Sequence, residues 1–253
     1  MEDKAIINRY GFNSDGAAAV RARLSAYRTS HPSFSSSSEI LGINLGKNKT
    51  TEVASDDYIK AMEALGEFGD YLVVNISSPN TAGLRSLQAS SEMEQLITRI
   101  QHAKLQNDLL KNKPLVVKIA PDLSPQELED VAKVSLKTKI DGLIVSNTTI
   151  SRPETLKSTH KNETGGLSGR PLKSRSLQVL KDIHRLTDGK ITLISVGGIE
   201  SGEDAYERLK AGASLVQVYS AIAYEGPGLA SRINDELDNL LERDGIDSVS
   251  KIV

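Results

Sequence analysis

Three polar residues stand at or just past the ends of short apolar runs, where buried strands would place them at one edge of a sheet. Lys118 interrupts the run LVVKI at 115–119. A lone ammonium group in such surroundings is costly without an anionic or strongly accepting partner. Asn44 and Asn147 also stand at the ends of apolar runs. The three residues together predict a site for a polar or anionic ligand.

The segment NISSPNT at 75–81 has six hydrogen-bonding or turn-forming residues among its seven. One interpretation is a strand-to-helix turn whose Asn and Ser side chains bind their own backbone, and for an isolated segment this is the favoured one. The other interpretation is a wall of a binding site. Lys118 and the strand-end amides support the second interpretation.

Small and hydroxyl residues near the carboxyl end of the chain indicate a phosphate site. Gly197-Gly198 and Tyr219-Ser220 follow the last two apolar runs, and Ser168-Gly169 lies inside the segment GGLSGRP. In β/α barrels, the loops after the last two strands commonly bind phosphate through backbone N–H groups. Paired glycines allow the close backbone approach that this requires.

Alternating strands and helices must position these residues. Six continuous apolar runs predict strands that are buried on both faces: 42–45, 71–74, 115–119, 142–145, 191–196 and 215–219. Helices are predicted between them, with Ser124 and Ser201 as caps, and a closing helix is predicted at about 228–241. This alternation is typical of βα units and a parallel sheet.

The predicted fold class is α/β, of the (β/α)8 TIM-barrel type, because polar residues gather past the strand ends. An open, doubly wound sheet also binds ligands there, but no glycine fingerprint follows Leu45. Eight strands are needed and six are found, and the first 15 residues do not offer a convincing pair of strands. We therefore expect an incomplete barrel with six of eight parallel strands, formed by a single domain at 1–253.

The composition excludes several classes of function. Lys plus Arg is 31 and Asp plus Glu is 33, so the formal charge of -2 provides no large basic field for nucleic acid. The chain has no cysteine, which excludes disulfides and thiolate metal sites, and we expect no metal centre. No apolar run is long enough to span a bilayer. The serine-rich stretch at 33–38 is interpreted as a flexible surface loop.

Eight segments, in order along the chain, closely resemble class 2 (quinone-linked) dihydroorotate dehydrogenase. The most specific are NISSPNTAGLR and TGGLSGRPL. The others include INRYGFNSDG, LGINLGKNKT, VVKIAPDLS, DGLIVSNTT, ISVGGIESGEDA and AGASLVQVYSA. The resemblance implies FMN as cofactor, dihydroorotate and orotate as substrate and product, and a quinone as electron acceptor. A base would remove the C5 proton while C6 delivers a hydride to flavin N5.

The resemblance also assigns roles to individual residues. Ser78 matches the class 2 base, where class 1 enzymes have cysteine, and Thr81 and Phe12 match residues that line its proton relay. The matches to cofactor contacts are Asn44, Asn75, Lys118, Ser146, Ser168, Gly169, Gly197, Gly198, Tyr219 and Ser220. The matches to substrate contacts are Asn8, Asn75, Asn80, Asn147 and Thr148.

The resemblance begins close to Met1, at the segment NRYGFN. Full-length class 2 enzymes carry targeting, membrane and quinone-tunnel segments and two barrel strands before it, and they belong to the mitochondrial inner membrane. We therefore expect the quinone entrance and the membrane contact to lie outside this chain, and expect the chain alone to bind FMN weakly and not to turn over quinone. Two alternatives stay open: a non-catalytic member of the family, and a barrel that only binds a phosphorylated ligand.

Overall fold

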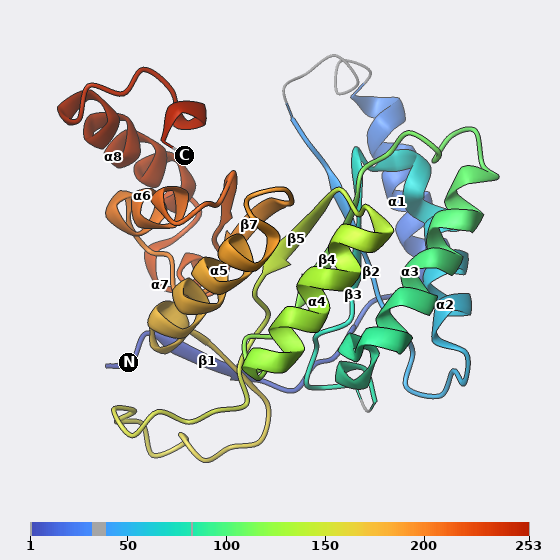
Figure 1. Ribbon diagram of the computed structural model, residues 1–253, viewed down its shortest axis with the longest axis horizontal. Helices are drawn as coiled ribbons and strands as arrows, with labels where there is room; N and C mark the ends of the chain where they lie inside the picture. The colour runs from blue at the N-terminus through green and yellow to red at the C-terminus, as the bar shows by residue number, and fades with distance from the viewer. Residues whose placement is uncertain (1, 32–38, 82, 253) are drawn as a thin grey trace.

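The computed structural model describes residues 2–31, 39–81 and 83–252 (Figure 1). The serine-rich stretch at 33–38 lies outside these residues. The strands are β1 (Ala5–Asn8), β2 (Gly42–Leu45), β3 (Tyr71–Asn75), β4 (Leu115–Ile119), β5 (Gly142–Val145), β6 (Gly166–Gly169), β7 (Thr192–Val196) and β8 (Leu215–Gln217). The helices are α1 (Ala17–Ser30), α2 (Ala54–Leu65), α3 (Ser90–Leu105), α4 (Pro125–Thr138), α5 (Lys173–Thr187), α6 (Gly202–Lys210), α7 (Ile222–Glu225) and α8 (Leu229–Arg243). Short 3-10 helices span Gly66–Phe68, Arg85–Gln88, Arg170–Leu172 and Val249–Lys251.

Six parallel strands form one curled, open sheet in the order β2-β3-β4-β5-β7-β8. These are the six strands that the apolar runs predict, and the incomplete barrel is confirmed for the residues that the structure describes. Helices α2, α3, α4 and α5 follow one another along the outer face of the sheet (Figure 1). Strands β2 and β8 are the two edges of the sheet.

The two faces of the sheet bury different sets of apolar side chains because successive residues of a strand point to opposite faces. One set, which includes Leu72, Val117 and Leu143, packs with buried residues of the helices such as Met93. The other set forms a small inner cluster of strand residues alone: Val73, Val116, Ile144, Ile194 and Val196. This inner cluster fills the hollow of the curled sheet below its carboxyl ends.

Polar residues occupy the next inner-face position along three of these strands. Asn75 follows Val73 on β3, Lys118 follows Val116 on β4, and Ser146 follows Ile144 at the end of β5. Asn75 and Lys118 are register partners across β3 and β4. Along each strand, the inner face therefore changes from apolar to polar between one inward-facing residue and the next. This change places Lys118 at the mouth of the hollow.

A second, two-stranded sheet was not predicted from the sequence. Strand β1 pairs antiparallel with β6, with Asn8 opposite Gly166 and Ala5 opposite Gly169. Together they cross the carboxyl ends of the large sheet, at the lower left in Figure 1. The first 15 residues thus supply one strand that closes the mouth from outside the barrel sheet.

Helix α4 begins with a complete capping box, as the sequence predicts. The Ser124 hydroxyl accepts the Glu127 N–H at 3.3 Å, and the Glu127 carboxylate accepts the Ser124 N–H at 2.7 Å. We expect Ser124→Ala to lower the free energy of unfolding by about 1 kcal/mol, measured by urea denaturation. Ser91→Ala is the matched control, since Ser91 lies in the first turn of α3 and its hydroxyl donates to the exposed Glu92 carboxylate rather than capping the helix. Equal effects of the two substitutions would contradict the capping role.

Candidate active site

One cavity of about 790 Å3 lies at the carboxyl ends of the parallel strands and is covered on one side by β1 and β6. We call it the mouth cavity. Its lining includes all the residues that the sequence analysis selected except Thr81: Asn8, Phe12, Asn44, Asn75, Ser78, Asn80, Lys118, Ser146, Asn147, Thr148, Ser168, Gly169, Gly197, Gly198, Tyr219 and Ser220. Residues that are more than 200 positions apart in the sequence thus surround one space.

Lys118 brings a positive charge to the mouth cavity. Its side chain is partly exposed there, and burial lowers the pKa of its ammonium group. Among the residues that the structure describes, no acidic side chain is close enough to counteract this effect. An unpaired cation beside neutral amides is suited to an anionic or strongly accepting group of a ligand.

Asn75 is the centre of a buried polar cluster beside Lys118. Its side-chain oxygen accepts hydrogen bonds from the Ser77 hydroxyl at 3.1 Å and from the Asn147 amide at 3.3 Å. Asn147 also donates to the Ser77 hydroxyl at 3.1 Å. On α2, the buried Tyr58 hydroxyl donates to the Asn75 carbonyl oxygen at 2.8 Å. Asn75 and Ser78 bind the local backbone, as the turn interpretation of NISSPNT predicts, and they also line the mouth cavity, so a role in binding stays a prediction.

Ser78 lies at the cavity wall in a nearly buried position. The residue is 7% exposed, and its hydroxyl oxygen accepts the Asn80 N–H at 3.3 Å. The Asn80 amide donates to the side-chain oxygen of Asn8 on β1 at 3.0 Å. Strand β1 thus holds the segment after Ser78 against the mouth.

The two predicted relay residues have different positions. Phe12 lines the cavity and packs so closely on Gly46 that a Cβ there would lie 2.6 Å from its ring. Thr81 is buried and does not line the cavity, and its hydroxyl lies beside Gly11, which does. Among the described residues, no direct hydrogen bond joins Ser78 to Thr81, so a proton relay between them would need an intervening group.

The opposite end of the mouth cavity has the features of a phosphate cradle. The Ser220 hydroxyl donates to the Ser168 hydroxyl at 2.7 Å. Gly197 and Gly198 have φ of 121° and 74°, backbone values that residues other than glycine rarely adopt. Tyr219 lines the same part of the cavity and is 79% exposed.

A buried arginine supports the glycine loop from behind. Arg208 on α6 has no exposed surface and donates to the carbonyl oxygens of Lys173 at 2.7 Å and Gly197 at 3.0 Å. Burial lowers its pKa to about 10, so it stays charged at neutral pH. The sequence analysis missed this residue, because a charged residue in an amphipathic helix usually indicates a solvated face.

A further pair of charged residues missed by the sequence analysis lies outside the cavity wall. The Arg85 and Asp122 side chains pair at 2.9 Å, and Arg85 also donates to the carbonyl oxygens of Ser77 and Thr148. The only sequence signal was a charge within otherwise neutral polar segments, NISSPNTAGLR and APDLS.

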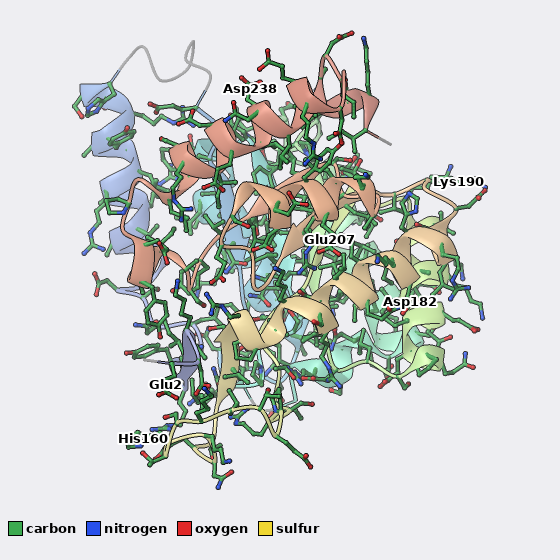
Figure 2. The ribbon with its side chains drawn as sticks, turned by 90° about the vertical axis from the view of Figure 1, so that its left-hand side faces the viewer. Glu2, His160, Asp182, Lys190, Glu207 and Asp238 are labelled. Carbon is green, nitrogen blue, oxygen red and sulfur yellow. The ribbon has the colours of Figure 1, made fainter. Side chains whose placement is uncertain are left out.

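A second cavity of about 830 Å3 contains none of the predicted residues. Its lining comes from the first residues of the chain and from the loop at 156–163. Figure 2 shows Glu2 and His160, two of its lining residues, at the same corner of the molecule. The second cavity is lined by Ala5 and Ile7 of β1 and the mouth cavity by Ile6 and Asn8, and the two cavities share Lys4.

The structure also bears on metals and membranes. Within residues 2–31, 39–81 and 83–252, no group of three or more acidic or histidine side chains is placed to hold a metal ion. In the same part of the chain, no helix is both long enough and apolar enough to cross a membrane.

The fold and the cavity together define an α/β protein of the TIM-barrel type with a large cavity at the carboxyl ends of its strands. The sequence model of the dihydroorotate dehydrogenase family matches residues 1–241. The chain belongs to this family.

Curated relatives match the chain over its whole length. The mitochondrial dihydroorotate dehydrogenase (quinone) of Mus musculus is 49% identical over 255 residues, which are 100% of this chain and 64% of that protein. That of Arabidopsis thaliana is 48% identical and is covered to 59%, and the dihydroorotate dehydrogenase (quinone) of Xanthobacter autotrophicus is 48% identical and is covered to 70%. The chain thus spans less than two thirds of the length of the mouse and plant relatives.

Solved structures of the family have the same fold. The ligand-free enzyme of Eimeria tenella superposes with a TM-score of 0.94 at 45% identity, over 100% of this chain and 74% of that one. The same enzyme in complex with ferulenol gives a TM-score of 0.92. These comparisons confirm the family resemblance and the fold, while the roles of the individual residues stay predictions.

Proposed function

We propose that the mouth cavity binds FMN and dihydroorotate, and that the chain takes part in the oxidation of dihydroorotate to orotate with a quinone as final acceptor. The observation that carries the proposal is the arrangement around one cavity of a candidate base, Ser78, an unpaired cation, Lys118, and a glycine cradle at Gly197-Gly198. A protein that only binds phosphate would need the cradle alone. The names of the relatives support the same reaction.

The residues of the cavity fit FMN. Its volume of about 790 Å3 lies within the usual range of ligand pockets, about 300–1,000 Å3. A Cβ at Gly169 would lie 2.3 Å from the Lys4 carbonyl oxygen, so the backbone is in tight contact beside the Ser168 and Ser220 hydroxyls. These hydroxyls and the backbone at Gly197 and Gly198 would hold the phosphate and ribityl chain, with Lys118, Asn44 and Asn75 at the ring. When bound, FMN would supply the acceptor for the hydride that leaves C6 of dihydroorotate.

The protein side chains would bind the substrate and move its C5 proton. We assign the hydrogen bonds to the substrate ring and carboxylate to Asn8, Asn75, Asn80, Asn147 and Thr148. Asn75, Asn80 and Asn147 are already oriented by hydrogen bonds of 3.0–3.3 Å, which lowers the entropic cost of binding. Ser78 would accept the C5 proton at its hydroxyl oxygen. A free serine is a weak base, so its own hydroxyl proton would have to leave toward solvent as the C5 proton arrives. Thr81 and Phe12 would line that path.

Anaerobic mixing tests the proposed function directly. The purified chain is titrated with FMN by fluorescence quenching and then mixed with dihydroorotate in the absence of quinone. We expect bleaching of the flavin band with one orotate formed for each FMN bound. Failure to bind FMN would favour the non-catalytic alternative, and FMN binding without bleaching would favour a barrel that only binds phosphorylated ligands.

Lys118→Met should lower the reduction potential of bound FMN. The reduced ring carries more negative charge than the oxidised ring, and a charged hydrogen bond contributes about 1.5–3 kcal/mol. For two electrons this is a decrease of about 30–65 mV, measured by spectroelectrochemistry. Because burial lowers the pKa of Lys118, its ammonium group loses its proton at a lower pH than an ordinary lysine does. The difference between wild type and variant should therefore shrink as the pH rises through that pKa.

The control for this substitution is Lys133→Met on α4. Lys133 is 67% exposed and lies 3.6 Å from the Glu129 carboxylate, outside the mouth cavity. The Lys133→Met substitution removes the same charge and should leave the reduction potential of bound FMN within a few millivolts of the wild-type value. Equal potentials for all three proteins would show that Lys118 does not face the flavin ring.

A further inference from the structure

We infer that Arg85 is a positioning residue that holds three loops of the mouth in one arrangement. Each of its guanidinium nitrogens contacts a different loop. Nε donates to the Ser77 carbonyl oxygen at 3.2 Å, one terminal nitrogen to the Asp122 carboxylate at 2.9 Å, and the other to the Thr148 carbonyl oxygen at 2.9 Å. We call 76–81, 120–124 and 146–151 the mouth loops, and they follow β3, β4 and β5.

Asp122 makes this contact rigid because its carboxylate is fully engaged. Its oxygens accept hydrogen bonds from the Thr149 hydroxyl and from the Ile150 N–H at 2.9 Å, and an ion pair with Arg175 on α5 adds a contact at 2.5 Å. Burial alone would raise the pKa of Asp122, but these hydrogen bonds and the Arg85 charge lower it below its usual value. The carboxylate therefore stays ionised at neutral pH and fixes the position of both guanidinium groups.

The two carbonyl oxygens that Arg85 holds lie next to the proposed chemistry. The Ser77 carbonyl belongs to the peptide group directly before Ser78, so Arg85 holds the backbone from which the Ser78 side chain extends. The Thr148 carbonyl follows Asn147 by one residue. Misplacement of a reacting group by about 1 Å can slow a reaction on the order of 10²-fold. This catalytic consequence rests on the proposed function, whereas the loop contacts do not.

A lysine at position 85 cannot reproduce the three contacts of the guanidinium group. A guanidinium presents its donors in a rigid planar fork, while an ammonium is a compact point charge on a flexible stem. Arg85→Lys should keep the ion pair with Asp122 and lose at least one of the two carbonyl contacts. Comparison of Arg85→Lys with Arg85→Met therefore separates the effect of charge from the effect of the fork.

Lys104→Met provides a matched control at the other end of the sheet. Lys104 is 8% exposed and also binds two backbone carbonyl oxygens, those of Lys111 at 2.9 Å and Lys113 at 2.7 Å. These carbonyls precede β4, so the contact lies away from the mouth. The control removes a buried cation and two carbonyl hydrogen bonds without touching a mouth loop.

Amide hydrogen exchange of the full chain tests the inference without FMN. In Arg85→Met we expect exchange at 76–81 and 146–151 to become at least tenfold faster, with a smaller increase in Arg85→Lys. Lys104→Met should accelerate exchange only near 105–114. Unchanged exchange in the mouth loops of Arg85→Met, or the same acceleration there in Lys104→Met, would overturn the inference.

Flavin bleaching by dihydroorotate provides the second measurement. We expect Arg85→Met to lower the limiting bleaching rate at least tenfold with FMN affinity changed by less than threefold, and Arg85→Lys to recover part of the rate. Faster amide exchange in the mouth loops of Arg85→Met with an unchanged bleaching rate would overturn the positioning role of Arg85 in catalysis. If the wild-type chain shows no bleaching at all, the proposed function fails, and the exchange data still decide whether Arg85 holds the mouth loops.

Discussion

Ser78→Ala should slow the bleaching of bound flavin by dihydroorotate by about 10²–10⁴-fold, the range that general base catalysis supplies. Orotate affinity should change little. Among the residues that the structure describes, the Ser78 hydroxyl is engaged by the Asn80 N–H alone, and the amide contacts of Asn75 and Asn147 remain in the variant. Loss of rate with retained binding indicates an interaction that acts in the transition state. Rapid-mixing absorbance measures the rate, and equilibrium titration measures orotate binding.

Ser86→Ala is the control for this substitution. Ser86 is exposed and donates to the Gly83 carbonyl oxygen at 2.6 Å, so the same hydroxyl is removed from a nearby part of the chain outside the cavity. Its bleaching rate should match that of wild type. A decrease of less than about tenfold in Ser78→Ala would mean that another group removes the C5 proton.

The strands of the large sheet could be predicted because their signal is local. Each of the six is a short run of apolar, β-branched residues, a pattern that predicts a strand of a parallel sheet wherever it occurs. The predicted burial on both faces is found for the central strands β3, β4, β5 and β7, but it is wrong for the edge strands β2 and β8, which are partly exposed because each has a neighbouring strand on one side alone. The starts of α4 and α6 could be predicted for the same reason. The Ser201 hydroxyl accepts the Asp204 N–H at 3.2 Å, a contact that depends only on neighbours in the sequence.

The pairing of β1 with β6 could not be predicted from the residues themselves. Both strands have four residues, and Ile6 pairs with Ser168 across more than 150 intervening positions. Neither segment alternates clearly enough to indicate which face is buried. The position of Asn8 at the mouth was therefore available only from the family resemblance.

The candidate site shows the same division between local and distant signals. Lys118 could be selected because a charge within LVVKI conflicts with burial. Arg85 gives no such signal, since its importance depends on Ser77, Asp122 and Thr148, which come from three separate loops. A guanidinium that joins backbone carbonyls leaves no pattern in the spacing of residues, so it becomes visible only when the loops are placed in space.

Gly198→Ala should weaken FMN binding by about 100-fold or more, on the order of 3 kcal/mol. Gly198 has φ of 74°, and a Cβ there would lie 2.5 Å from the Lys173 Cα and 2.6 Å from the Lys173 nitrogen. These are backbone atoms at the start of α5, so the loop itself must move away. Binding of riboflavin, which lacks the phosphate, should fall much less. Fluorescence titration with both ligands separates the phosphate cradle from the ring site.

Gly189→Ala is the matched control because it has the same backbone strain without the clash. Gly189 has φ of 64°, and a Cβ there would meet only the His184 ring, at 3.4 Å. It lies between α5 and the amino end of β7, whereas the mouth cavity, whose lining does not include Gly189, lies at the carboxyl ends of the strands. Both variants should lose about 1–2 kcal/mol of stability to the left-handed backbone. Only Gly198→Ala should separate FMN from riboflavin, and an equal loss for both ligands would move the phosphate site away from this loop.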